Sequence, residues 1–287
     1  MCLAETTDVV RHRHEHAQEH EHDRHAVSRR RFLGGGTALA AGVVATVAAP
    51  AVPATARPDP LRRVVDLTHR LRRDFPTFDD LQPVDEVIHD FDTSGYFAKR
   101  WEIPEHTGTH IDTPGHFNEG QRLVDDLLAS ELVVPIVVID VAAKAMDDPN
   151  ATVEPDDLIR FERRYGPIPP RALVCMDSGW AVKADDTDEY RGGPAYPDFN
   201  FPGFGIEATD WLVARRNAVG IGVDTLSLDP GNSTTFDVHH GFLGADRYGI
   251  ENLNNLNRIP PQGAFTFVGA IPWEDGSGSP CRVLATW

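Results

Sequence analysis

Residues 106–116 read His106-Thr-Gly-Thr-His110-Ile-Asp112-Thr-Pro-Gly-His116, and the interpretation of the whole chain starts from this stretch. Three imidazoles and one carboxylate occupy relative positions 0, 4, 6 and 10. On a helix, His106 and His110 would share a face while Asp112 and His116 would point away. Glycine and proline also disfavour a helix. Because side chains alternate in an extended chain, the even offsets predict an extended segment or strand, running into a turn, that brings all four groups to one side.

The residue types in this stretch are typical of a metal site. Imidazole nitrogen and carboxylate oxygen bind Zn²⁺, Mn²⁺ or Fe²⁺, and three ligands with an open position indicate a catalytic ion. Thr107 and Thr109 add hydroxyls that can support the ligands. We therefore predict a divalent ion here, with Zn²⁺ or Mn²⁺ preferred. The alternative, a histidine-rich turn without metal, is the weaker interpretation because chance seldom supplies convergent ligands.

The stretch resembles the signature HxGTHxDxPxH of the cyclase family of metal-dependent hydrolases, which includes bacterial kynurenine formamidases and isatin hydrolases. The resemblance implies that His106, His110 and Asp112 hold the metal and that His116 is the catalytic acid/base. It extends from about Val64 to the C-terminus and implies the swivelling β/β/α architecture. The matching positions are His106, Gly108, Thr109, His110, Asp112, Pro114 and His116.

A second pair of candidate ligands lies near the end of the chain. His239 and His240 are adjacent, and Glu251 follows twelve residues after His239. A straight helix would place residues twelve apart about 120° out of register, so only a bent segment could bring them together. The resemblance to kynurenine formamidases implies that His239 and Glu251 complete a two-metal site and that Asp112 bridges the two ions. His240 is then a neighbour of the site and not a ligand. The alternative is that Glu251 is a surface charge near an unrelated histidine.

Residues 1–56 differ from the rest of the chain. Between His12 and His25, six histidines alternate with Arg, Glu and Asp, which predicts a disordered, solvated tract, with metal gathering as the alternative. An arginine-rich segment, Ser28-Arg-Arg-Arg-Phe-Leu33, precedes an apolar run and Ala54-Thr-Ala56. This combination predicts a twin-arginine signal peptide and a mature domain of residues 57–287. We expect export by the twin-arginine machinery to the periplasm, the cell surface or the exterior.

Charge and cysteine content narrow the range of partners. The formal net charge is −17, and residues 1–56 carry six basic and six acidic residues, so the whole excess lies in residues 57–287. Such a surface disfavours nucleic acid as a partner. We expect a small-molecule substrate and a homodimer. Cys175 and Cys281 could form a disulfide in an exported protein, but two buried free thiols are favoured because nothing resembles a disulfide framework.

The mature part predicts a single α/β domain with a mixed sheet, because strands alternate with helices but outnumber them. The run 132–141 is continuously apolar and predicts a strand covered on both faces. A loop is expected over 184–204, and the loop 74–78 carries Phe75 and Phe78. The resemblance implies that this region supplies aromatic residues to the substrate pocket; core packing is the alternative for each. Predicted strands are 64–68, 84–91, 96–103, 132–141, 172–176, 219–223, 265–268 and 282–285, and predicted helices are 155–165 and 206–217.

These features together predict a metal-dependent hydrolase of a small amide-like bond. We expect it to resemble an arylformamidase that acts on substrates of the N-formylkynurenine type. Isatin-type lactam or lactone hydrolysis, and ring formation or dehydration, are the enzymatic alternatives. A non-catalytic metal-binding protein outside the cytoplasm is the remaining alternative. His116 argues against it, because metal storage by three ligands does not need a fourth imidazole nearby.

Overall fold

The computed structural model describes residues 63–287, so the histidine-rich tract and the predicted signal peptide lie outside the described residues. Within the described part, an eight-stranded mixed sheet forms the centre of the domain. The strand at one edge of this sheet, β4 (His110–Asp112), also pairs with β12 (Gly278–Thr286), the second strand from the other edge. The sheet therefore closes on itself like a barrel. Four neighbouring strands, β5, β7, β9 and β10, run parallel and the remaining pairings are antiparallel. In order, the strands are β1 (Val64–Asp66), β12 (Gly278–Thr286), β11 (Ala264–Ala270), β5 (Val133–Asp140), β7 (Leu173–Asp177), β9 (Gly220–Val223), β10 (Tyr248–Glu251) and β4 (His110–Asp112).

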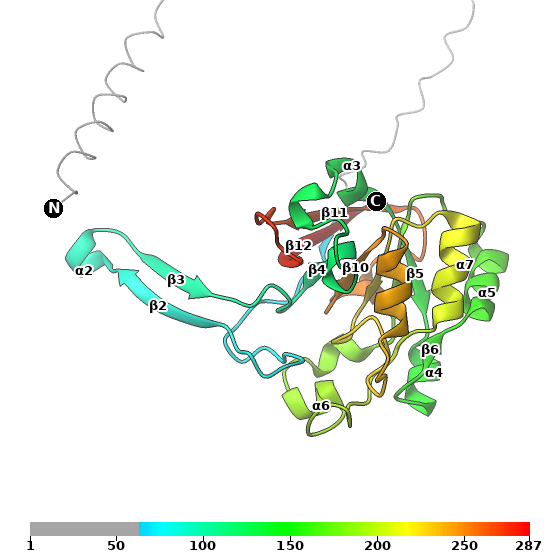
Figure 1. The fold of residues 1–287 in the computed structure, drawn as a ribbon, viewed down its shortest axis with the longest axis horizontal. Helices are drawn as coiled ribbons and strands as arrows, with labels where there is room; N and C mark the ends of the chain where they lie inside the picture. The colour runs from blue at the N-terminus through cyan, green and yellow to red at the C-terminus, as the bar shows by residue number, and fades with distance from the viewer. Residues whose placement is uncertain (1–62) are drawn as a thin grey trace, which may run out of the picture. The chain divides into compact units, whose positions relative to one another are not determined.

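Two helices, α5 (Pro155–Tyr165) and α7 (Ile206–Arg216), lie side by side against the parallel strands (Figure 1). Leu158 and Leu212 are fully buried in a core cluster shared with strand residues such as Ile221. Alternate residues of β5 contribute to this cluster and to a second one on the other face of the sheet. The strand is therefore covered on both faces, as its continuous apolar sequence predicts.

The predicted pair of strands over 84–103 forms a hairpin that projects from the domain (Figure 1). Strand β2 (Val84–His89) pairs antiparallel with β3 (Ala98–Glu102), and the expected turn contains a one-turn helix, α2 (Phe91–Ser94). Gly95 ends that helix in the left-handed region, with φ +74°. The side chains of the hairpin include several exposed apolar groups, among them Phe91 and Phe97.

The predicted class, a single α/β domain with a mixed sheet, is confirmed for the described residues, and the swivelling β/β/α type stays a prediction. The prediction of a loop over 184–204 was incomplete, because this segment also contains two regular elements. They are α6 (Thr187–Arg191), which Asp186 caps, and β8 (Gly203–Phe204), which pairs with β6 (Thr152–Val153). Cys175 and Cys281 are both buried free thiols. None of the described helices is both long and apolar enough to cross a membrane. The short remaining helices are η1 (Pro114–His116), η2 (Val124–Asp126), α3 (Ala129–Leu132), α4 (Ala142–Asp147), η3 (Trp180–Lys183), η4 (His239–Leu243) and η5 (Leu256–Arg258).

Candidate metal centre and active site

The two groups of predicted ligands meet through the sheet. Strand β4 lies between β10 and β12, and its residues His110 and Asp112 are buried. In the antiparallel pairing with β10, Glu251 lies opposite His110 and Gly249 lies opposite Asp112. The segment that precedes β4 is not extended, because Gly108 turns the chain in the left-handed region with φ +66°. The expected strand therefore covers only the three central residues of the motif, His110–Asp112, and His106 reaches the site from the turn.

Close backbone approach on the other side of β4 depends on Gly278. A Cβ atom at this position would lie 2.5 Å from Cε1 of His106 and 2.7 Å from the carbonyl oxygen of Ile111. Both distances are shorter than van der Waals contact, so a larger residue would displace the His106 ring. The glycine at the start of β12 thus leaves room for the imidazole beside the strand.

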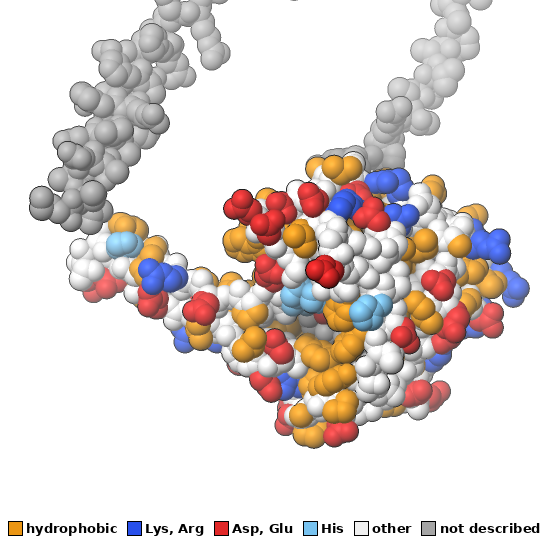
Figure 2. Space-filling model, in the orientation of Figure 1, with side chains coloured by type: hydrophobic (Ala, Val, Ile, Leu, Met, Phe, Trp, Pro, Cys, Tyr) orange, Lys and Arg blue, Asp and Glu red, His pale blue; other side chains and the backbone are white. Residues whose placement is uncertain are grey.

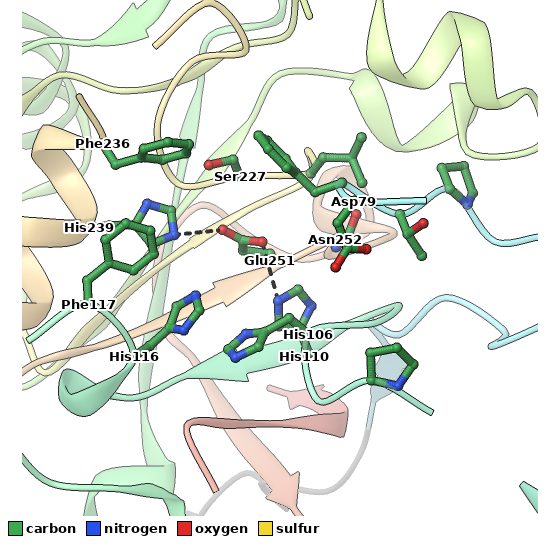
Figure 3. A pocket seen from close by; sticks show the side chains of 15 residues that line it. Asp79, His106, His110, His116, Phe117, Ser227, Phe236, His239, Glu251 and Asn252 are labelled. Atoms are coloured by element: carbon green, nitrogen blue, oxygen red, sulfur yellow. Dashed lines mark ion pairs between the residues drawn. The ribbon is translucent and has the colours of Figure 1, made fainter. Parts of the chain in front are cut away.

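Five side chains converge at one point, and the four of them that line a pocket, His106, His110, His239 and Glu251, are drawn in Figure 3. His106 Nδ1 lies 2.7 Å from Asp112 Oδ1, and His110 Nε2 lies 3.3 Å from the same oxygen. Nε2 of His110 is also 3.3 Å from Glu251 Oε2. His239 Nε2 lies 3.3 Å from Glu251 Oε1 and 3.8 Å from Asp112 Oδ2. The five form two potential ligand groups that share Asp112, and within each group the ligand atoms lie within 4.8 Å of one another.

Two buried atoms at this point indicate that the residues fit a cation. Neither His110 Nε2 nor Asp112 Oδ2 has a hydrogen-bond partner among the described residues, although both are buried. A buried polar atom without a partner costs about 1–3 kcal/mol, so it calls for an explanation. Imidazole nitrogens and carboxylate oxygens directed at one another supply the ligand set of a divalent transition ion. His106, His110 and Asp112 would hold one ion, and Asp112, His239 and Glu251 a second.

The charges of the site support the same interpretation. Burial disfavours the charged form of His110, but the adjacent carboxylates of Asp112 and Glu251 outweigh it and raise its pKa to about 10. Burial also disfavours the charged form of His239, but the hydrogen bonds that its ring donates to the carboxylates of Asp229 and Glu251 outweigh it and raise its pKa to about 10. Without metal, the carboxylates thus attract protons onto the imidazoles. A divalent cation can replace those protons, which links metal binding to proton release.

In each of the three candidate ligand histidines, the ring nitrogen that faces away from the cluster has a contact of its own. His110 Nδ1 lies 2.8 Å from the carbonyl oxygen of Gly108, and His239 Nδ1 lies 2.6 Å from Asp229 Oδ2. His106 Nε2 lies 2.9 Å from the hydroxyl of Ser277. Such contacts fix ring orientation in metal sites. Asp229 and Ser277 were not predicted from the sequence, because no fixed spacing relates them to the histidines they contact.

The ring of His116 lies beside the candidate ligand cluster. His116 ends the short helix η1, stacks on His106 with ring centroids 3.8 Å apart, and lies 6.0 Å from the ring of His239. No hydrogen bond joins its ring to another residue of the described part. Burial lowers its pKa to about 4, so the ring is uncharged at neutral pH. An uncharged ring that lines the pocket can accept a proton there.

Beside the candidate ligand residues lies a cavity of about 270 Å³. Figure 2 shows a hollow in the surface that histidine and hydrophobic side chains border. Phe78, Phe117 and Phe236 line it, and the rings of Phe117 and Phe236 lie 5.5 Å apart. Phe236 has φ +50°, a conformation that is uncommon for an aromatic residue and often found at functional sites. Apolar walls over a small number of polar groups are typical of a small-molecule site. The remaining lining residues include Thr77, Asp79, Leu226, Ser227 and Asn252.

The structure separates the two candidate aromatic residues of the N-terminal loop. Phe78 lines the pocket, whereas Phe75 is fully buried in a core cluster, where its ring lies 6.3 Å from that of Tyr190. Because it has no exposed surface, Phe75 is placed as a core residue rather than a pocket residue. His240 is exposed and packs on Phe117, away from the ligand cluster, as expected of a neighbour.

Residues 65–230 match the model of the family described as "Putative cyclase". This chain belongs to the cyclase family. The resemblance inferred from residues 106–116 is therefore confirmed. Among cyclase-family relatives, the isatin hydrolase of Roseibium aggregatum is 28% identical over 222 residues, which cover 73% of this chain and 84% of that protein. The kynurenine formamidase of Salinibacter ruber is 31% identical over 186 residues, covering 63% and 76% respectively.

Solved structures of the cyclase family agree with this relationship. Isatin hydrolase A from Ralstonia solanacearum superposes with a TM-score of 0.74 at 34% identity, covering 78% of this chain and 91% of that one. An isatin hydrolase bound to the product analogue thioisatinate gives a TM-score of 0.75 at 25% identity, covering 78% and 92%. These relatives support a cyclase-family hydrolase as the general class of this chain, and the cluster of histidines and carboxylates is suited to a divalent metal.

Proposed function

We propose that this protein hydrolyses the C–N bond of a small aryl amide with the help of one or two divalent ions, Zn²⁺ or Mn²⁺. The observation that carries the proposal is the convergence of His106, His110, Asp112, His239 and Glu251 at the floor of an aromatic pocket, with His116 beside them. The isatin hydrolases and kynurenine formamidases among its relatives support the same reaction class.

The pocket residues would divide the work of hydrolysis between them. A divalent ion, when bound, supplies an activated water and polarises the scissile carbonyl. His116 would take a proton from the attacking water and deliver it to the leaving nitrogen, which becomes an amine as the carbonyl carbon becomes a carboxylate. Phe78, Phe117 and Phe236 would hold the aryl ring, and the hydroxyl of Ser227 and the amide of Asn252 offer hydrogen bonds to its polar atoms.

The charge of the pocket favours an isatin-type lactam as substrate. Among the described residues that line the cavity, none is Lys or Arg, and the acidic group Asp79 lies at the pocket. A substrate carboxylate held away from the metal would therefore find no basic side chain as counter-ion, whereas an uncharged bicyclic lactam needs none. N-formylkynurenine carries such a carboxylate. Arylformamidase activity is the second candidate. The resemblance to kynurenine formamidases implies the additional ligand pair His239 and Glu251, and these two residues lie together with Asp112.

A single assay panel tests this proposal. The purified mature protein would be analysed for bound metal and incubated with isatin, formanilide, N-formylkynurenine and an aryl lactone, before and after metal removal. We expect metal-dependent release of the ring-opened acid, with isatin preferred over N-formylkynurenine. Metal without turnover would favour a binding protein, and a product formed without addition of water would favour a cyclase or dehydratase; either result contradicts the proposal.

We also propose export and self-association. Replacing Arg29 and Arg30 by lysine should trap the precursor in the cytosol, because the twin-arginine route reads this pair. The exposed apolar side chains of the β2–β3 hairpin support the expectation of a homodimer, since isolated two-stranded hairpins are marginally stable. Normal secretion of the double lysine variant would contradict export by this route. Light scattering coupled to size-exclusion chromatography measures the oligomeric state, and a monomer would contradict self-association.

A further inference from the structure

Ser277 connects His106 to a carboxylate that is not part of the ligand cluster. The Ser277 hydroxyl lies 2.9 Å from His106 Nε2 and 2.6 Å from Glu105 Oε2. The backbone N–H of Ser277 donates to the same glutamate oxygen at 3.0 Å. Its carbonyl oxygen accepts from both the N–H (3.1 Å) and the hydroxyl (2.7 Å) of Thr113. Ser277 is thus anchored on both sides, so the position of its hydroxyl is fixed.

The donor and acceptor capacities of these groups determine the direction of the hydrogen bonds. A carboxylate only accepts, and a hydroxyl has one proton to donate. The Ser277 hydroxyl therefore donates to Glu105 and presents a lone pair to His106. Nε2 of His106 must then carry the proton that forms this contact. The other nitrogen, Nδ1, lies 2.7 Å from Asp112 Oδ1 in the ligand cluster. It can share a proton with that carboxylate or, once a cation displaces the proton, offer its lone pair to the cation.

The other two imidazoles of the cluster, His110 and His239, present Nε2 rather than Nδ1 to the cluster. The Gly108 carbonyl holds the Nδ1 side of His110, and Asp229 holds the Nδ1 side of His239, so Nε2 is the free atom in both. His106 alone among the three presents Nδ1. Which nitrogen of a histidine binds a metal is set by the hydrogen bond that the other nitrogen makes, so an acceptor beside Nε2 of His106 reserves Nδ1 for the metal.

We infer that Glu105, acting through Ser277, is a positioning residue that makes Nδ1 of His106 a metal ligand. This inference rests on the proposed metal site. Glu105 has no contact with the cluster itself; its effect is to orient the hydroxyl. Loss of a comparable supporting hydrogen bond typically reduces metal affinity by 10–100-fold.

The test measures zinc affinity by chelator competition and the protonation of His106 by ¹⁵N NMR of the zinc-loaded protein. Glu105→Ala and Ser277→Ala should each weaken zinc binding by roughly 10–100-fold. In the unaltered protein, the NMR spectra should show zinc on Nδ1 and a slowly exchanging proton on Nε2. That proton should exchange rapidly in Ser277→Ala. Glu105→Gln should retain most of the affinity, because its amide oxygen can still accept from the hydroxyl.

Glu102→Ala is the matched control, because Glu102 is an exposed glutamate three positions earlier in the chain. It should bind zinc as the unaltered protein does. Zinc bound to His106 through Nε2, or full affinity in both alanine variants, would overturn the inference. If the unaltered protein binds no zinc or manganese, the proposed function itself fails, which is a distinguishable result. Thermal unfolding of each variant separates loss of affinity from loss of fold. Ser277→Ala keeps the test decisive if Glu105→Ala does not fold, because it removes the hydroxyl through which Glu105 would act on His106.

Discussion

Glu251 lies directly opposite His110 in the antiparallel pairing of β10 with β4, and its Oε2 is 3.3 Å from His110 Nε2. Two ligand segments far apart in the sequence are therefore joined by backbone hydrogen bonds. The distance between their side chains is set by the register of the sheet rather than by flexible loops. A shift of one residue would turn Glu251 to the opposite face of the sheet, so the candidate metal site and the closed sheet depend on one another.

This arrangement predicts separate roles for the two ligand groups. Glu251→Gln removes one negative charge from the second group and leaves His106, His110 and Asp112 intact. We expect a second ion to be lost or bound at least tenfold more weakly, while the first is retained. Elemental analysis and titration calorimetry would measure this. The exposed Glu207→Gln serves as control, and equal metal content in the two variants would argue against a ligand role for Glu251.

His116 should be needed for turnover but not for metal. Its ring stacks on His106 and has no hydrogen bond to another described residue, so His116→Ala should keep the metal while kcat falls roughly 10²–10⁴-fold. KM should change less, because a proton-transfer group acts mainly in the transition state. His110→Ala should lose metal and activity together. Metal analysis and steady-state kinetics of both variants separate the cases. Loss of metal from His116→Ala would show that His116 is a ligand, and an unchanged kcat would show that it takes no part in the reaction.

The sequence predicted those features that depend on local patterns. Helix α5 matches its predicted bounds, because Pro155 and two acidic residues mark its first turn and two arginines its last. The first ligand motif was found because three histidines and one aspartate occupy offsets 0, 4, 6 and 10 within eleven residues, and His239 and Glu251 were found through the family resemblance. Strand β10 was not predicted, since Tyr248–Glu251 is short and is defined by its partners β9 and β4.

The supporting groups of the site were beyond the reach of sequence patterns. Asp229 and Ser277 contact histidines that are 10 and 171 residues away, through loops whose paths are set by tertiary packing. The division between Phe75 in the core and Phe78 in the pocket has the same origin. The two residues lie three positions apart in one loop, and only the packing around Tyr190 and Phe236 distinguishes them.

The aromatic wall should determine substrate affinity. Phe78 lines the cavity and its ring lies 6.0 Å from that of Phe236, so Phe78→Ala would remove one face of the proposed aryl site. We expect KM for the aryl substrate to rise roughly tenfold, in keeping with the loss of a buried aromatic contact, with a smaller change in kcat. Phe265→Ala, at a half-exposed phenylalanine of β11, is the control. Equal KM values in the two variants would show that the substrate does not use this wall.

Asp224 should make the stability of the fold depend on pH. Its carboxylate is buried after β9 and accepts hydrogen bonds from the hydroxyl of Ser178 (2.6 Å) and the backbone N–H of Trp180 (2.9 Å). Burial nevertheless raises its pKa from 3.8 to about 6, and the nearby carboxylate of Asp177 acts in the same direction. Because the folded pKa exceeds the unfolded one, the protonated form contributes stability below about pH 4, and this contribution is lost as the pH rises through about 6.

Asp224→Asn tests this because an amide does not titrate. The free energy of unfolding of the variant, relative to the unaltered protein, should rise between pH 4 and pH 7 by up to about 3 kcal/mol and then stay level. Denaturant unfolding at several pH values measures the difference, with the exposed Asp188→Asn as matched control. A difference that is constant across this range, or that falls as the pH rises, would show that the hydrogen bonds from Ser178 and Trp180 outweigh burial and keep Asp224 ionised in the folded protein.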